Sequence, residues 1–220
     1  MLYKVFPISN GMIITYNGLE FFKMQVGDTV VAFNPISKDS KYKSSKFGAD
    51  ICFVSVNHND FNGTDQVAFG EKQPFVVKGP GEYEVKEIFI RGFESHSSYD
   101  GKDLINTIYL LTLDNINVCF LGALDVKELK PDVIEALGEI DILFVPIGGS
   151  GVLSPQDAYK LAVQLEPKII IPMHYEESGK DVLKTFLKEA GEDTKPIDKL
   201  TVKKKDLEGK EAEVVVIAKT

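Results

Sequence analysis

The period of the hydrophobic pattern changes near Asp125, and this change constrains the fold more than any other feature of the chain. Before Asp125, short runs rich in β-branched and aromatic residues are separated by turn residues. Asn17 and Gly18, for example, form a dipeptide that is typical of a β-hairpin turn. The first half of the chain is therefore predicted to be a succession of β-strands.

After Asp125, helices and strands are predicted to alternate. Three segments have the spacing or the end signals of helices: 125–137, 154–165 and 178–190. Strand-like apolar runs lie between and after them: 141–145, 168–171, 200–204 and 214–218. Asp125 is a candidate cap for the first helix, and Ser154 followed by Pro155 is a typical start for the second.

This order of elements predicts an α/β (α+β) protein. Two mixed β-sheets packed face to face, with helices on their outer faces, would accommodate strands first and alternating elements later. No linker or low-complexity stretch divides the two halves. We therefore expect a single domain over residues 1–220, folded as an αββα sandwich.

The charge of the chain argues against two classes of partner. A net charge of −8 disfavours general binding to nucleic acid and to anionic membranes, since both require a basic surface. The basic run at 38–46 has no interleaved aromatic residues of the kind that stack on bases, and we interpret it as a solvated loop.

The chain shows no signal for export or for membrane insertion. No apolar run approaches the roughly 20 residues that span a bilayer, and the first residues lack the pattern of a signal peptide. A cytoplasmic location is therefore expected. Cys52 and Cys119 both lie inside apolar runs and are predicted to be core residues rather than a disulfide.

The three histidines of the chain share a position at or just beyond the end of a predicted strand. His58 follows the strand at 51–56, His96 follows the strand at 83–92, and His174 follows the strand at 168–171. If these strand ends converge on one edge, three imidazoles meet there together with Asp60. Histidine with carboxylate is a ligand set that suits Zn²⁺, Mn²⁺ or iron. The alternative is that each histidine is only a turn residue or a half-buried polar residue.

At this point the chain resembles a known family, the metallo-β-lactamase superfamily, and within it the compact hydrolase branch that includes ascorbate-6-phosphate lactonase-like proteins. The similar segments follow the order of that family over most of the chain: 13–18, 30–35, 79–85, 106–109, 121–124, 141–149 and 169–175. The last two, D-I-L-F-V-P-I-G-G and I-I-I-P-M-H-Y, are the most specific. The resemblance implies an αββα sandwich and a metal-dependent hydrolase.

The departures from the family pattern fall on the metal ligands. The family motif His-x-His-x-Asp-His reads V-N-H-N-D-F at 56–61, so Val56 and Phe61 replace its first and last histidines. Ala123 stands where the family has its bridging aspartate, and Asn34 where it has an aspartate before proline. The resemblance implies that His58 and His96 would serve one metal, whereas Asp60 and His174 would serve the other. Each half-site would then have two protein ligands and no bridge.

Two functional hypotheses follow. Because a catalytic zinc usually has three protein ligands and an open position, a standard two-metal hydrolysis is not expected. The first hypothesis is a non-catalytic descendant that keeps the sandwich for ligand binding or assembly. The second is a hydrolase with one atypical metal, in which Asp60 would act on the attacking water and His174 would bind the metal or the substrate.

The second hypothesis defines a ligand set and a substrate class. The metal would be held by His58, Asp60, His96 and His174. We expect at most one ion, Zn²⁺ or Mn²⁺, or no ion at all. By analogy with the fold, the substrate would be a small ester, lactone or phosphoester. A small-molecule ligand is the expected partner, and the sequence leaves a homo-oligomer open.

Overall fold

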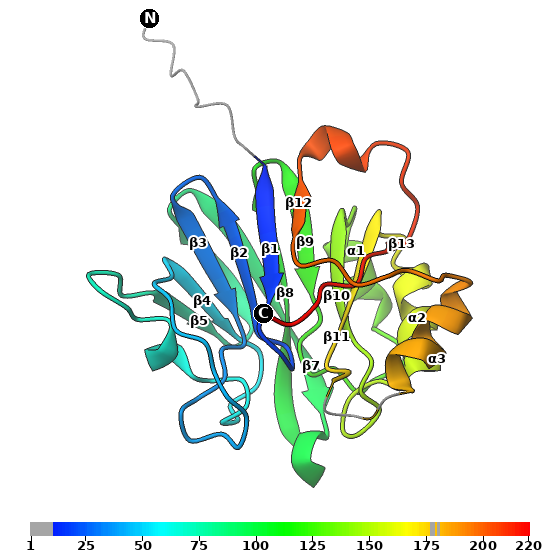
Figure 1. The fold of residues 1–220 in the computed structure, drawn as a ribbon, viewed down its shortest axis with the longest axis horizontal. Coiled ribbons are helices and arrows are strands. Elements are labelled where there is room, and N and C mark those ends of the chain that lie inside the picture. The colour runs from blue at the N-terminus through cyan, green and yellow to red at the C-terminus, as the bar shows by residue number, and fades with distance from the viewer. Residues whose placement is uncertain (1–10, 177–178, 180) are drawn as a thin grey trace, which may run out of the picture.

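The computed structural model describes residues 11–176, 179 and 181–220, and these form two mixed β-sheets packed face to face (Figure 1). The six-stranded sheet has the order β12 (Leu200–Val202), β1 (Met12–Tyr16), β2 (Phe22–Val26), β3 (Thr29–Phe33), β4 (Ile51–Val54) and β5 (Phe75–Lys78). The seven-stranded sheet has the order β13 (Glu213–Val214), β11 (Ile169–Met173), β10 (Ile142–Pro146), β9 (Ile116–Phe120), β8 (Leu104–Leu113), β7 (Ile88–Ser97) and β6 (Gly81–Val85). The expected sandwich of mixed sheets is confirmed.

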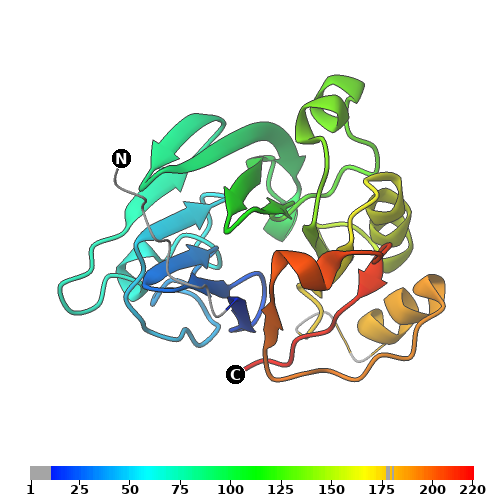
Figure 2. The ribbon, with the colours of Figure 1, turned by 90° about the horizontal axis from the view of Figure 1, so that it is seen from above.

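The α-helices lie beside the seven-stranded sheet, as Figure 2 shows from above. They are α1 (Pro131–Leu137), α2 (Pro155–Gln164) and α3 (Val182–Ala190). Short 3₁₀ helices occur at η1 (Thr64–Gln66), η2 (Tyr99–Gly101) and η3 (Lys204–Leu207). Strands β9, β10, β11 and β13 run parallel, as expected for continuously apolar strands that are covered on both faces. None of the helices in the described part of the chain is long and apolar enough to cross a membrane.

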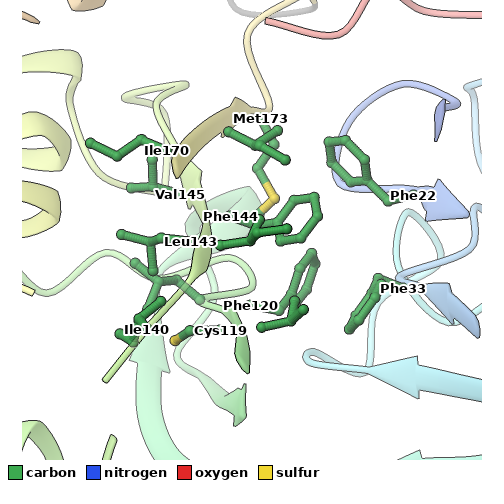
Figure 3. Packing of buried hydrophobic residues seen from close by; sticks show 14 of the residues in the cluster. Phe22, Phe33, Cys119, Phe120, Ile140, Leu143, Phe144, Val145, Ile170 and Met173 are labelled. Carbon is green, nitrogen blue, oxygen red and sulfur yellow. The ribbon is translucent and has the colours of Figure 1, made fainter. Parts of the chain in front are cut away.

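The core contains aliphatic and aromatic side chains, and aromatic rings from both sheets meet between them (Figure 3). The Phe33 ring stacks on Phe53 with centroids 4.9 Å apart and on Phe120 with centroids 4.8 Å apart, so it joins the two sheets. Phe22 meets Phe144 edge-on at 4.7 Å. Aromatic side chains contribute large buried areas, and their stacked or edge-on pairs add to the stability of the core.

A second apolar cluster covers the other face of the six-stranded sheet. Residues in β3 and β4 alternate between the two clusters: Phe33 and Phe53 point between the sheets, whereas Ala32 and Cys52 belong to the second cluster. Both cysteines of the chain are free and buried, and burial raises the pKa of each thiol. The prediction that they are core residues is confirmed.

Several segments differ in their bounds from the sequence-based expectation. The helix predicted at 178–190 is described as Val182–Ala190, and residue 178 lies outside the described residues. Two other differences bear on the candidate site. Strand β7 continues to Ser97, beyond the predicted end near residue 92, because its backbone pairs with β8 through His96 and Ser97. The first helix begins at Pro131 rather than at 125, since proline is favoured in the first turn and cannot lie deeper in a helix. Ser154 does cap α2, with its hydroxyl accepting a hydrogen bond from the Asp157 amide.

Asp50, which lies just before β4, ties the two sheets together at one end of the sandwich. Its carboxylate contacts the ammonium of Lys72 at 2.7 Å and that of Lys86, in the turn between β6 and β7, at 2.5 Å. It also accepts a hydrogen bond from the Val30 amide at 2.9 Å. Although burial opposes the charged form, these contacts lower the pKa of Asp50 to about 2.

The low pKa of Asp50 predicts a pH dependence of stability. The folded-state pKa lies below the ordinary value of 3.8, so the stabilisation is complete above about pH 4 and is lost as the pH falls through about 2. We expect Asp50→Asn to lower the free energy of unfolding by about 1–2 kcal/mol at pH 6. This loss is smaller than the pKa shift alone would give, because both lysines are exposed and water screens their charges. Urea unfolding of both proteins from pH 2 to pH 6 checks this. A difference that does not shrink towards pH 2 would contradict it.

Candidate functional site

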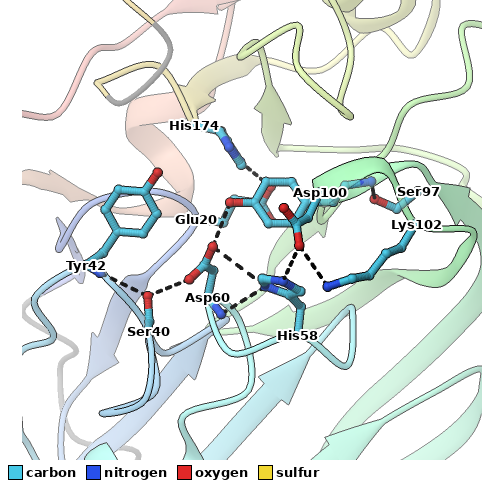
Figure 4. A network of polar contacts seen from close by, with 10 residues as sticks. Glu20, Ser40, Tyr42, His58, Asp60, Ser97, Asp100, Lys102 and His174 are labelled. Atoms are coloured by element: carbon cyan, nitrogen blue, oxygen red, sulfur yellow. Dashed lines mark hydrogen bonds and ion pairs between the residues drawn. The ribbon is translucent and has the colours of Figure 1, made fainter.

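The turn after β4 places His58 and Asp60 next to each other (Figure 4). The His58 amide donates to the Val56 carbonyl and the Phe61 amide to the His58 carbonyl, so the chain reverses tightly here. His58 Nδ1 accepts a hydrogen bond from the Asp60 amide at 3.2 Å and lies 3.6 Å from Asp60 Oδ2. The polar turn expected from the sequence therefore presents both side chains at one strand end.

The Asp60 carboxylate is buried, and both of its oxygens are hydrogen-bonded. Ser40 Oγ donates to Oδ1 at 2.5 Å, and Tyr99 Oη donates to Oδ2 at 2.8 Å. Ser40 belongs to the basic segment at 38–46, which thus lies against the His58–Asp60 turn. A buried carboxylate needs such partners because an unpaired charge away from water is costly.

The ring of Tyr99 lies at the centre of this cluster. Its centroid is 5.0 Å from that of His58, 5.3 Å from that of His174 and 4.7 Å from that of Phe61. Only 8% of Tyr99 is exposed. Burial, together with the hydrogen bond to Asp60, raises the pKa of the Tyr99 hydroxyl, so this group stays protonated and acts as a donor.

The backbone around Tyr99 holds the ring in place. Tyr99 begins η2, in the connection between β7 and β8, and the next residue, Asp100, has a positive φ of 57°. The loop that contains Gly151 packs directly on this turn. A Cβ atom on Gly151 would lie 2.7 Å from the Ser98 carbonyl oxygen and from the Tyr99 Cα atom, so only glycine fits without a shift.

His174 approaches the cluster from the end of β11 and belongs to a second, deeper network. Its Nδ1 lies 2.9 Å from Oε1 of Glu20, which is fully buried. Asn34 Nδ2 donates to the other oxygen of Glu20 at 2.7 Å and to Ser55 Oγ at 2.7 Å. His174 also has a positive φ of 61°, and its amide donates to the Leu19 carbonyl at 2.6 Å. The network fixes the orientation of the His174 ring.

His96 occupies a different environment. Its Nδ1 lies 2.8 and 3.0 Å from the two oxygens of Asp125, and its Nε2 lies 2.8 Å from Asp103 Oδ1. The hydrogen bonds to Asp125 and then Asp103 raise the pKa of His96 and favour the imidazolium. Both ring nitrogens are therefore engaged by carboxylates at the base of the β7–β8 connection.

The structure thus brings together three of the four predicted site residues. His58, Asp60 and His174 surround the Tyr99 ring, whereas the contacts of His96 are with Asp103 and Asp125. Sequence reasoning missed Tyr99 and Glu20. Tyr99 lies in a polar stretch without periodicity. Glu20 does leave a signal, because it is a carboxylate directly before the apolar pair Phe21 and Phe22.

Comparison with known proteins places the chain in a family. A family profile described as a beta-lactamase superfamily domain matches residues 13–174, which is most of the chain. The chain belongs to the metallo-β-lactamase superfamily. A protein of this superfamily from Thermotoga maritima has 30% sequence identity and superposes with a TM-score of 0.75, covering 94% of this chain and 98% of that one.

Curated relatives of this chain carry the name UPF0173 metal-dependent hydrolase. The Lysinibacillus sphaericus protein is 25% identical over 199 residues, which cover 74% of this chain and 85% of the relative. The Thermococcus onnurineus protein is 35% identical over 82 residues, but the match covers only 37% of its length. Beyond the superfamily, the chain is thus similar to proteins that are named as metal-dependent hydrolases.

Side chains around Tyr99 provide a test of whether the chain can hold the metal that these names imply. In residues 11–176, 179 and 181–220, no group of three or more His, Cys, Asp or Glu side chains is arranged to bind a metal ion. Metal ligands must lie about 2 Å from a shared ion. Here the Tyr99 ring packs in a T-shaped arrangement against both His58 and His174, with ring centroids 5.0 and 5.3 Å away. As arranged, these residues do not fit a metal centre, and no catalytic step is derived through one.

Proposed function

We propose that this member of the metallo-β-lactamase superfamily does not carry out two-metal hydrolysis and uses the sandwich to bind a ligand. The position of Tyr99 is the main observation that supports this proposal. Its ring takes up the space between His58 and His174, and its hydroxyl binds the Asp60 carboxylate. A tyrosine with a raised pKa remains a neutral donor, and it satisfies a carboxylate that would otherwise be available to a cation.

The residues at the positions of the missing family ligands support the same proposal. Phe61 is fully buried and packs on Tyr99, and Val56 is almost fully buried in the same apolar cluster. Ala123, in place of the family's bridging aspartate, is buried there too. Apolar side chains at these positions make the charge of a metal ion unfavourable, because no anionic ligand would compensate for its loss of water.

Metal content is the measurement that tests this proposal. Protein purified without a histidine tag is incubated with Zn²⁺ or Mn²⁺, desalted and analysed by elemental mass spectrometry. We expect less than about one tenth of an equivalent in the wild-type protein and the same low value in His58→Ala, since the Tyr99 ring separates the ligands. About one equivalent in the wild type, lost in His58→Ala or Asp60→Ala, would overturn the proposal.

A second candidate function is hydrolysis with one metal ion. The observation that favours it is that His58, Asp60 and His174 lie around the same side chain, so that a movement of Tyr99 would leave them facing one space. Asp60 would then orient the attacking water, and His174 would bind the metal or a small ester, lactone or phosphoester. Unchanged turnover of every detected substrate in Asp60→Ala and His174→Ala would exclude this candidate.

A further inference from the structure

A cavity of about 490 Å³ lies at the end of β7, and its lining includes none of Tyr99, His58, Asp60 and His174. Its walls are the last residues of β7, the first half of β8 and the segment 126–133, which leads into α1. Cavities that bind small molecules in proteins commonly measure about 300–1,000 Å³. This cavity therefore has the size of a ligand pocket.

Part of the cavity lining is apolar. Ile108 and Leu129 are buried, and Ile105, which also lines the cavity, is 63% exposed. Ile105 pairs directly with His96 across β7 and β8, so the ladder between these strands fixes its position. An exposed isoleucine next to buried apolar side chains would lose contact with water if a ligand covered it, and this burial would favour binding.

The rim of the cavity has an excess of negative charge. Glu94 and Glu128 are exposed and form no ion pair with any residue of the described chain. Asp103 also lies on the rim, but it shares the single positive charge of His96 with Asp125. Lys130 is the remaining cation of the lining. The carboxylates thus outnumber the cations that can neutralise them.

We propose that this cavity binds a small apolar molecule that carries a primary ammonium group, such as an n-alkylammonium ion. Its hydrocarbon part would lie on Ile105, Ile108 and Leu129, and its ammonium group would face the carboxylates of Glu94 and Glu128. The carboxylate rim repels an anionic ligand of the same length. This cavity would be the site of the ligand binding proposed above, and an alkylammonium ion would be the class of ligand. Binding there does not depend on the metal content of the protein.

Titration with hexylammonium, followed in ¹H–¹⁵N NMR spectra of the full chain, tests the proposal. We expect shifts of backbone amides confined to 94–96, 103–108 and 126–133. Binding should tighten about fourfold for each methylene added from butyl- to octylammonium, because each buried methylene adds about 0.8 kcal/mol. Hexanoate should bind at least tenfold more weakly than hexylammonium, and hexanol should lie between them.

Paired variants separate local contacts from the overall charge. We expect the double variant Glu94→Gln/Glu128→Gln to weaken hexylammonium binding about fivefold while leaving hexanol binding unchanged. The matched control is Glu84→Gln/Glu189→Gln, which removes the same charge from exposed positions outside the cavity. Ile105→Ser should weaken binding of both ligands, whereas Phe89→Ser, at an equally exposed position elsewhere, should not.

Four results would overturn the proposal: no binding of hexylammonium, hexanoate binding as tightly as hexylammonium, shifts outside the cavity only, or equal weakening by the two double variants. The titration is repeated on metal-free and Zn²⁺-treated protein. A zinc equivalent in the elemental analysis would refute the absence of a metal centre while leaving the cavity result intact. Failure of hexylammonium to bind would refute the ligand class while leaving the metal result intact.

Discussion

Replacing Tyr99 with alanine is expected to lower the free energy of unfolding by about 3–5 kcal/mol, the range for removing a large aromatic side chain from a packed interior. The ring is nearly buried and packs against His58, Phe61 and His174. The substitution would also leave the buried Asp60 carboxylate without one of its donors. Urea unfolding at pH 7, monitored by circular dichroism, measures the loss.

Two further variants separate the contributions of Tyr99. Tyr99→Phe keeps the ring and removes only the hydroxyl, so we expect a loss of about 1.5–3 kcal/mol from the hydrogen bond to a charged acceptor. Tyr83→Ala removes a half-buried tyrosine whose hydroxyl donates to the Gly79 carbonyl, and its cost should be clearly smaller than that of Tyr99→Ala. If Tyr99→Ala cost less than about 1 kcal/mol, the ring would not be the packed centre of the site.

Replacing Glu20 with alanine should have an effect of similar size, about 3–5 kcal/mol, because it removes the shared acceptor of a buried hydrogen-bond network. Glu20 is inaccessible to solvent and accepts hydrogen bonds from Asn34 and from His174. After the substitution, both donors would remain buried without this acceptor. The same urea experiment measures the loss, with Glu189→Ala on the exposed face of α3 as the control.

Glu20→Gln distinguishes the loss of charge from the loss of shape. Glutamine has nearly the same volume but replaces one acceptor oxygen with a donor, which would face either Asn34 Nδ2 or His174 Nδ1. We therefore expect a cost of about 1–3 kcal/mol. A Glu20→Ala cost within about 0.5 kcal/mol of the Glu189→Ala cost would show that the network contributes no net stability.

The sequence predicted the fold because the decisive signals are local. The change of period near Asp125 separated the meander of β-strands from the alternating half, and Ser154 marked the start of a helix correctly. Local signals misplaced the start of α1, where Asp125 resembled a cap. Its carboxylate contacts His96, which is 29 positions earlier in the chain, and a one-dimensional pattern cannot display such a pairing.

The candidate site was less predictable from the sequence. Strand ends correctly suggested that His58, Asp60 and His174 lie close together, because side chains beyond neighbouring strands meet at one edge. The same rule grouped His96 with them, but β7 continues past its predicted end, and His96 is held by Asp103 and Asp125. Tyr99 could not be recognised, since its role depends on how the turn between β7 and β8 packs against residues that come from both sheets.

The pairing of β1 with β12 has a consequence for how this protein acquires its structure. Met12 pairs with Val202, and the hydroxyl of Thr220 donates to the carbonyl of Tyr16, 204 positions earlier. The pairing of β1 with β12 therefore cannot form until residues 200–202 have left the ribosome. Contacts over such separations must overcome a large loop-closure entropy before they stabilise the fold, so folding is expected to be slow.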